Sequence, residues 1–180
     1  MSSPQIQLKD KTFIPYLNKQ QIHETVKRLA SQLNEEYHDK KPLFVCILSG
    51  SFMFCSDLVK NFCGDCEITF VRLSSYSGTQ STGNITTLMG LVESLTDRHV
   101  IIVEDIVDTG NTLSKFLPEV QALQPASLKV CSLLVKPEAL QDRIKVDFVG
   151  FSIPNDFIVG YGLDYDGLGR NLQEIYVIKP

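Results

Sequence analysis

The sequence lacks the features that would assign it to several large classes of protein. No apolar run approaches the roughly 20 residues that a membrane-spanning helix requires. Residues 1–10 do not have the basic and then apolar pattern of a signal peptide. The chain contains no Gly-x-x-x-x-Gly-Lys motif, which argues against a nucleotide switch with a Walker-type loop. It also has no internal repeat, low-complexity tract or linker. These absences predict a cytoplasmic protein without a membrane partner, built as one domain spanning residues 1–180.

An excess of positive charge is missing as well, and the five cysteines are odd in number. The net charge is -4, whereas a nucleic-acid-binding protein uses a basic face to neutralise phosphates, so no nucleic-acid partner is expected. A local basic site for a small polyphosphate is still possible. The apolar surroundings of Cys46, Cys55 and Cys131 predict buried free thiols. Cys63 and Cys66 have the spacing of a redox or zinc pair, but no second pair or nearby histidine completes a zinc site.

What the chain does contain is an alternation of apolar runs and helical patterns. Residues 18–37 predict a helix, because Asn18 and Gln21 fit a capping box and apolar residues follow at helical spacing. This helix is the only element expected before the first strand. Strands are expected at 43–48, 68–73, 100–103, 128–135, 148–151, 157–159 and 175–178, with helices at 51–62 and 112–123. Apolar strands separated by helices indicate a mostly parallel sheet covered on both faces, which binds ligands beyond the carboxyl ends of its strands.

The most informative segment is Val100–Leu113, with the sequence VIIVEDIVDTGNTL. The expected strand ends at Val103, Glu104 and Asp105 follow, and residues 108–112 lead into a helix. Gly110 permits a tight turn, and the threonine hydroxyls with the unpaired N–H groups of the helix form an anion site. Acids beside an anion site suit a sugar phosphate, whose hydroxyls donate to carboxylates while its phosphate accepts from N–H groups. A helix cap with surface acids is the alternative interpretation, and the complete string disfavours it.

The string from Val103 to Gly110 closely resembles the phosphoribosyl pyrophosphate signature of type I phosphoribosyltransferases. Further segments resemble the hypoxanthine-guanine branch of that family in order and spacing: 48–50, 74–76, 134–136 and 147–165. The resemblance covers about residues 43–178. It implies an α/β fold with a mostly parallel central sheet flanked by helices. It also implies a core at about 40–150 and a small hood formed by about 1–20 and 150–180.

The resemblance implies an enzyme of purine salvage, which transfers a phosphoribosyl group to hypoxanthine or guanine and forms a homodimer or homotetramer. It leaves the use of xanthine open. It implies roles for individual residues as well. The ribose hydroxyls would bind Glu104 and Asp105, and Asp108 would be the catalytic base at purine N7. The 5′-phosphate would be wrapped by Asp108, Thr109, Gly110, Asn111 and Thr112. Pyrophosphate would contact Ser49, Gly50, Ser75, Tyr76 and Arg170. The base would contact Lys136 through O6, Phe157 by stacking, Ile158 through its backbone, and Asp164. The cofactor Mg²⁺ would lie near Glu104, Asp105 and Asp164.

Each of these segments also has a plainer structural interpretation. Ser49 or Ser51 would cap the next helix. The resemblance implies that residues 74–84 form a lid that excludes water from the site, and the plainer interpretation is a surface loop. Lys136 would be a solvated lysine at a strand end, and Phe157 would be a core aromatic. The resemblance implies a strained peptide between residues 49 and 50 and leaves its cis or trans state open.

Two rival functions remain open at this stage. Other family branches use adenine, orotate or uracil, and the segments around residues 136 and 157 argue against them. A regulator that binds phosphoribosyl pyrophosphate and controls RNA or DNA would need a basic face or an added domain. Two positions also differ from some members of the family, because Ser49 and Asn111 stand where those members carry lysine. The phosphate sites therefore rely more on backbone N–H groups and hydroxyls.

Overall fold

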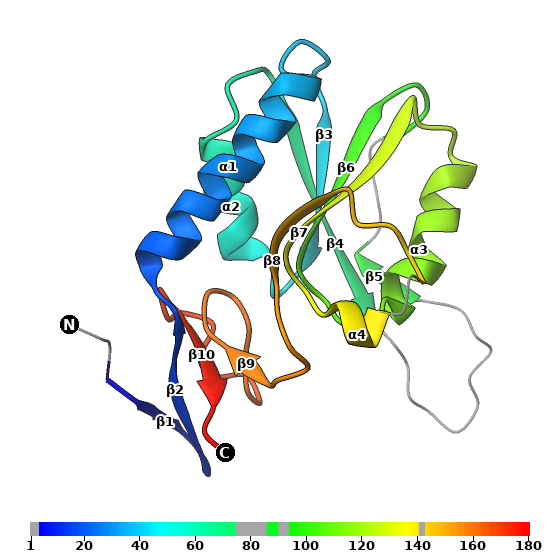
Figure 1. The fold of residues 1–180 in the computed structure, drawn as a ribbon. Helices are drawn as coiled ribbons and strands as arrows, with labels where there is room; N and C mark the ends of the chain where they lie inside the picture. The colour runs from blue at the N-terminus through cyan, green and yellow to red at the C-terminus, as the bar shows by residue number, and fades with distance from the viewer. Residues whose placement is uncertain (1–3, 75–85, 90–93, 141–142) are drawn as a thin grey trace.

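The computed structural model describes residues 4–74, 86–89, 94–140 and 143–180 (Figure 1). Within these residues the chain forms a main sheet with helices on both faces and a smaller sheet beside it. None of the helices in the described ranges is long and apolar enough to span a membrane.

The chain begins with two strands and a long helix. Strands β1 (Ile6–Leu8) and β2 (Lys11–Leu17) precede α1 (Lys19–Tyr37), so the expectation of a helix alone before the first strand is wrong. The cap of α1 is confirmed: Gln21 N donates to Asn18 Oδ1 and Asn18 N donates to Gln21 Oε1, both at 2.9 Å. The predicted apolar stripe of α1 is buried. Strand β2 escaped prediction because its partner, β10 (Ile175–Ile178), lies at the other end of the chain.

The main sheet has the order β5-β4-β3-β6-β7-β8. Its strands are β3 (Leu43–Leu48), β4 (Glu67–Ser74), β5 (Thr86–Met89), β6 (His99–Val107), β7 (Ser127–Val135) and β8 (Phe148–Ser152). Five of these strands pair in parallel, and β5 pairs antiparallel at the edge. The predicted parallel sheet is therefore confirmed, and β5 was not anticipated.

Helices cover both faces of this sheet (Figure 1). Helices α1 and α2 (Phe52–Lys60) lie on one face, and α3 (Asn111–Ala122) lies on the other. The short α4 (Pro137–Leu140) follows β7. In β3, Phe44 and Cys46 join the apolar cluster under α1 and α2, whereas Val45 and Ile47 join the cluster under α3. This alternation buries both faces of the strand, which is why its sequence is apolar throughout.

Strand β6 is longer than its sequence suggests. It was expected to end at Val103 and continues to Val107. Pairing with β3 stops at Val103, but β7 continues to pair with β6, through Glu104 and Ser132 to Val107 and Val135. The acids Glu104 and Asp105 therefore lie in the second half of a strand, held by a neighbour on one side.

The second sheet is formed by the two terminal segments of the chain. Its order is β1-β2-β10-β9, all antiparallel, where β9 is Ile158–Val159. Phe13, Val159 and Tyr176 form its own small apolar cluster. We call this sheet, together with residues 160–174 that connect β9 to β10, the hood. The predicted fold class, a helix-flanked and mostly parallel sheet with a small hood, is confirmed.

Candidate active site

The predicted phosphate loop connects β6 to α3 and turns at Gly110. Gly110 has a φ of 72°, in the left-handed region, and a Cβ at this position would lie 2.6 Å from Leu140 Cδ1. Both observations require glycine. The amide of Asn111 donates to Thr109 Oγ1 at 3.4 Å. Residues 104 and 106–113 line a cavity of about 270 Å³ together with Ile47, Leu48 and Leu73. The predicted site residues of this segment thus share one cavity, although Asp105 is not among its lining residues.

The two acids of β6 lie in a region that is poor in positive charge. Asp105 is buried. Burial raises the pKa of Glu104 well above its ordinary value, and the neighbouring Asp105 carboxyl adds to this effect. Neither acid forms an ion pair with a basic side chain among the residues that the structure describes. A ligand that brings hydroxyl donors or a cation would supply what the two carboxyls lack.

Lys136 and Asp108 form an ion pair at the edge of the cavity. Lys136 Nζ lies 3.0 Å from Asp108 Oδ2. The lysine side chain is only 9% exposed, whereas that of Asp108 is 46% exposed. The interpretation of Lys136 as a solvated strand-end lysine is therefore wrong. These two residues are 28 positions apart in the sequence. They meet because β6 and β7 pair in parallel, and the pairing continues past the end of β7, where Lys136 N donates to Val107 O at 2.9 Å.

A second loop, residues 48–51, lies directly against Asp105. A Cβ on Gly50 would lie 1.8 Å from Asp105 Oδ2, so only glycine permits this approach. The cis peptide bond is Leu48–Ser49, directly after β3 ends at Leu48 and one residue before the Ser49–Gly50 bond that was singled out. Ser51 occupies the cap position of α2, but its Oγ donates to Ile47 O at 2.6 Å instead of capping the helix.

The hood completes the surroundings of this loop through Gly162. A Cβ on Gly162 would lie 1.9 Å from Gly50 O, so the 48–51 loop is held between β6 and the hood. Tyr161 Oη donates to Asp57 of α2 at 2.7 Å and anchors this contact. Sequence reasoning missed Gly162, and the closely spaced glycines at 160 and 162 were the available signal.

Asp164 and Arg170 pair with each other in the hood. Arg170 Nη2 lies 2.6 Å from Asp164 Oδ1, and Arg170 Nη1 donates to Gly162 O at 2.7 Å. The second oxygen of Asp164 accepts from Gly167 N at 2.7 Å. Both predicted residues therefore lie beside the contact between the hood and the 48–51 loop.

The predicted base-binding aromatic lies on the hood surface. Phe157 is 46% exposed and packs against Phe13 and Tyr165, with ring centroids 6.3 and 5.8 Å away. The interpretation of Phe157 as a core aromatic is therefore wrong. Strand β9 is an edge strand, and Phe157 O already accepts from Ile178 N. Backbone groups alternate in direction along an antiparallel strand, so the N–H and carbonyl of Ile158 point away from β10. Ser75 and Tyr76 lie outside the described residues.

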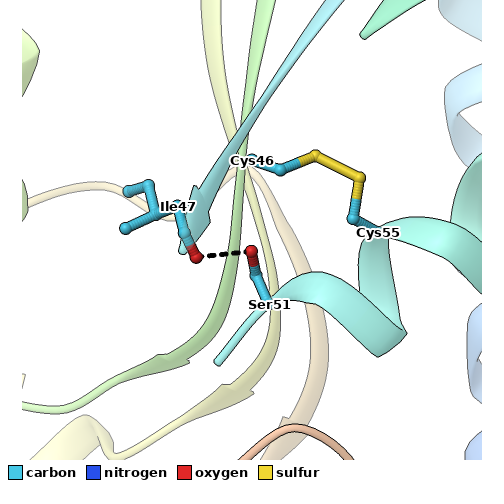
Figure 2. The surroundings of a disulfide bond; sticks show 4 residues. All are labelled: Cys46, Ile47, Ser51 and Cys55. Atoms are coloured by element: carbon cyan, nitrogen blue, oxygen red, sulfur yellow. Dashed lines mark hydrogen bonds between the residues drawn. A yellow bond between two sulfur atoms is a disulfide. The ribbon is translucent and has the colours of Figure 1, made fainter. Parts of the chain in front are cut away.

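A disulfide links the two elements that flank the 48–51 loop. Figure 2 shows Cys46 at the end of β3 joined to Cys55 of α2, with Ser51 and Ile47 beside them. The prediction of free thiols is therefore wrong for Cys46 and Cys55, whereas Cys131 is a buried free thiol as expected. The 48–51 turn folds α2 back over β3 and brings the two Cα atoms to 6.4 Å, within the range that a disulfide spans.

This disulfide predicts a thiol count. Protein purified without reductant and unfolded in guanidinium is expected to release three thiols per chain to an alkylating reagent, from Cys63, Cys66 and Cys131. Mass spectrometry after proteolysis should then recover residues 46 and 55 in one cross-linked peptide pair. All five cysteines of the chain should react after reduction. Five reactive thiols before reduction would contradict the pairing.

Comparisons with known proteins agree with this geometry. The phosphoribosyl transferase domain family matches residues 15–166. A hypoxanthine-guanine-xanthine phosphoribosyltransferase of Tritrichomonas foetus is 40% identical over 163 residues, covering 90% of this chain and 89% of that protein. A hypoxanthine-guanine phosphoribosyltransferase of Bacillus subtilis is 39% identical over 165 residues, covering 91% and 92%. A solved hypoxanthine phosphoribosyltransferase of Staphylococcus aureus superimposes with a TM-score of 0.87 at 40% identity, covering 92% of this chain and 91% of that one. The chain belongs to the phosphoribosyl transferase domain family.

Proposed function

We propose that this protein transfers the 5-phosphoribosyl group of phosphoribosyl pyrophosphate to N9 of hypoxanthine or guanine. The products are IMP or GMP and pyrophosphate, so the reaction serves purine salvage. The observation that carries the proposal is the pairing of Lys136 with Asp108 at the edge of the loop cavity. It places a donor and a proton acceptor side by side, next to a loop suited to a sugar phosphate.

Lys136 provides the selection of the base. An ammonium group donates hydrogen bonds and never accepts them. It therefore matches the O6 carbonyl of a 6-oxopurine and has no use for the exocyclic amine of adenine. The exposed ring of Phe157 is free to stack on the base, and the outward backbone groups of Ile158 are free to bond its edge. These features favour 6-oxopurines over the other bases used in the family.

The two loops divide phosphoribosyl pyrophosphate between them. The loop of residues 108–112 takes the 5′-phosphate on its N–H groups and hydroxyls. Glu104 and Asp105 accept hydrogen bonds from the ribose hydroxyls. The loop at Ser49 and Gly50 takes the pyrophosphate, assisted by Arg170. The guanidinium of Arg170 bonds Asp164 and Gly162 O, and its five N–H groups leave further donors for pyrophosphate.

The residues present are suited to a magnesium complex of the substrate. Mg²⁺ is commonly held by one or two carboxylates together with substrate phosphates. No group of three or more acidic, histidine or cysteine side chains is placed to hold a metal within the described residues. The adjacent carboxyls of Glu104 and Asp105 pair with no basic side chain in the described part of the chain, so they fit such a shared site. Asp164 pairs with Arg170 beside the 48–51 loop, which is proposed to take the pyrophosphate. When bound, Mg²⁺ would neutralise charge on the departing pyrophosphate.

The proposed reaction is a displacement at ribose C1′. The N9–C1′ bond forms as the bond from C1′ to the pyrophosphate oxygen breaks, and pyrophosphate leaves with the electron pair. Asp108 accepts the N7 proton, since its carboxylate is exposed toward the cavity and held by Lys136. The acids of β6 stabilise positive charge that develops on the ribose.

We also propose that the protein forms a homodimer or homotetramer. Ile68 and Phe70 lie two residues apart in β4, so their side chains share one face of the strand, where they are 43% and 41% exposed. Neighbouring exposed apolar side chains on a sheet favour contact with another chain. Light scattering that returned the mass of a single 20.2 kDa chain at micromolar concentration would contradict this proposal.

A spectrophotometric assay tests the function directly. The protein is mixed with phosphoribosyl pyrophosphate, Mg²⁺ and one of hypoxanthine, guanine, xanthine or adenine. We expect turnover with hypoxanthine and guanine and none with adenine. The relative from Tritrichomonas foetus is described as using xanthine, which makes xanthine the informative third base. Turnover that occurs only with adenine, or the absence of turnover with any of the four bases, would refute the proposal.

A further inference from the structure

Arg143 lies directly against the outer side of the phosphate loop. Its Nη1 donates to Thr109 O at 3.2 Å and also bonds Asn111 Oδ1. A Cβ on Gly110 would lie 3.4 Å from Ile144 Cγ1 and 3.9 Å from Arg143 Cβ, so side chains of the segment after α4 pack on the turn itself. The roles assigned above make no use of this arginine, and no pattern in the sequence singles it out.

The chemistry of the guanidinium decides how Asn111 is oriented. A guanidinium has donors and no acceptor, so its partner on Asn111 is the amide oxygen. The amide nitrogen, with its two N–H donors, is therefore left for another acceptor. Asn111 is the first residue of α3 and lines the 270 Å³ cavity, where the unpaired N–H groups of the helix begin. An amide nitrogen presented there adds a donor to an anion site.

Charge is the second reason that Arg143 matters at this position. Residues 104–113 contain three acids and no lysine or arginine. A phosphate on this loop would therefore meet backbone and hydroxyl donors close to three carboxyls. Lys136 is engaged by Asp108. Among the described residues, Arg143 is a second basic residue on the loop, and it contacts the loop through Thr109 and Asn111.

We infer that Arg143 is a positioning residue for the 5′-phosphate. It holds the Thr109 carbonyl and the Asn111 amide so that the amide nitrogen donates to the phosphate, and its charge offsets the nearby acids. The inference rests on the proposed function and adds a residue specific to phosphate binding. It predicts that losing Arg143 weakens every ligand that carries the 5′-phosphate and leaves ligands without it unaffected.

Steady-state kinetics and calorimetry test this role. Arg143→Ala is expected to raise KM for phosphoribosyl pyrophosphate about 10-fold, because it removes a hydrogen bond from a charged group that orients the loop. KM for hypoxanthine and kcat should change less than about 3-fold. Binding of IMP should weaken by a similar factor, whereas binding of inosine, which lacks the phosphate, should not change. Lys145→Ala is the matched control, because it removes the same charge two residues away from a side chain that is 80% exposed.

Variants of Asn111 separate positioning from general support of the loop. Asn111→Ala should reproduce the phosphate-specific loss. The double variant Arg143→Ala/Asn111→Ala should lose less IMP affinity than the product of the two single losses, because Arg143 acts in part through Asn111. Introducing Asn111→Lys into Arg143→Ala should restore phosphate binding by placing a cation on the loop.

The outcomes distinguish this inference from the proposed function. A wild-type protein that converts no base would refute the function. A wild type that converts hypoxanthine, with Arg143→Ala binding IMP as tightly, would refute only the role of Arg143. Equal weakening of inosine and IMP, or losses that multiply in the double variant, would also overturn the inference.

Discussion

Replacing Asp108 with Asn is expected to slow turnover with hypoxanthine by roughly 10²–10⁴. The amide keeps the shape of the carboxyl and still accepts a hydrogen bond from Lys136, which lies 3.0 Å away. It cannot take a proton from purine N7. The substitution should lower the melting temperature, because Lys136, whose side chain is 9% exposed, loses the opposite charge beside it.

The measurement is kcat from the spectrophotometric assay, combined with calorimetric binding of IMP. Binding should weaken only modestly, because the phosphate and ribose contacts remain. Asp39→Asn is the matched control, since Asp39 is an exposed carboxyl in the turn between α1 and β3. Turnover of Asp108→Asn within about 3-fold of wild type would show that another group accepts the proton.

Replacing Gly50 with Ala is expected to lower kcat/KM for phosphoribosyl pyrophosphate by about 10², because a displacement of 1 Å in a catalytic site has an effect of this size. The new Cβ would lie 1.8 Å from Asp105 Oδ2 and 2.5 Å from its Cγ. The loop has no room to retreat, since Gly162 of the hood approaches Gly50 O from the other side. The substitution must therefore displace either the 48–51 loop, which is proposed to take the pyrophosphate, or the carboxyl of Asp105, which is proposed to hold the ribose.

The same substitution should also destabilise the fold by about 1–3 kcal/mol, as overpacking does. Gly64→Ala separates the two effects. A Cβ at Gly64 would lie 2.0 Å from His38 O, so it meets a similar clash at the end of α1, beside the start of β3. We expect comparable destabilisation by urea unfolding and unchanged kcat/KM in the folded control. An equal loss of kcat/KM in both variants would mean that Gly50 matters for stability alone.

The sequence predicted those parts of the protein whose evidence is local. Helix α1 follows from its capping box and its apolar spacing, and β3 and β7 follow from short runs that are apolar on both faces. The phosphate loop was predictable because residues 104–112 are contiguous. Its acids, glycine and helix start therefore lie near one another in any fold that forms the turn.

The plainer interpretations of single side chains failed where a partner lies far away in sequence. As an alternative to binding the base, Lys136 could have been a solvated lysine, but it is buried against Asp108. Phe157 could have been a core aromatic, but it lies on the hood surface. Cys46 and Cys55 looked like separate buried thiols and form a disulfide. In each case the local pattern is compatible with both states, and packing decided between them.

The sequence by itself determined the helix-flanked parallel sheet and the chemical nature of the loop after β6, because both depend on neighbouring residues and on a repeating apolar pattern. The resemblance implied that the terminal segments form a hood. Only the tertiary structure decided that the hood contains a sheet with the strand order β1-β2-β10-β9, that Gly162 closes on Gly50, and that Arg143 contacts the phosphate loop. These contacts join segments separated by tens of residues. Their geometry depends on how whole elements pack, which no short stretch of sequence encodes.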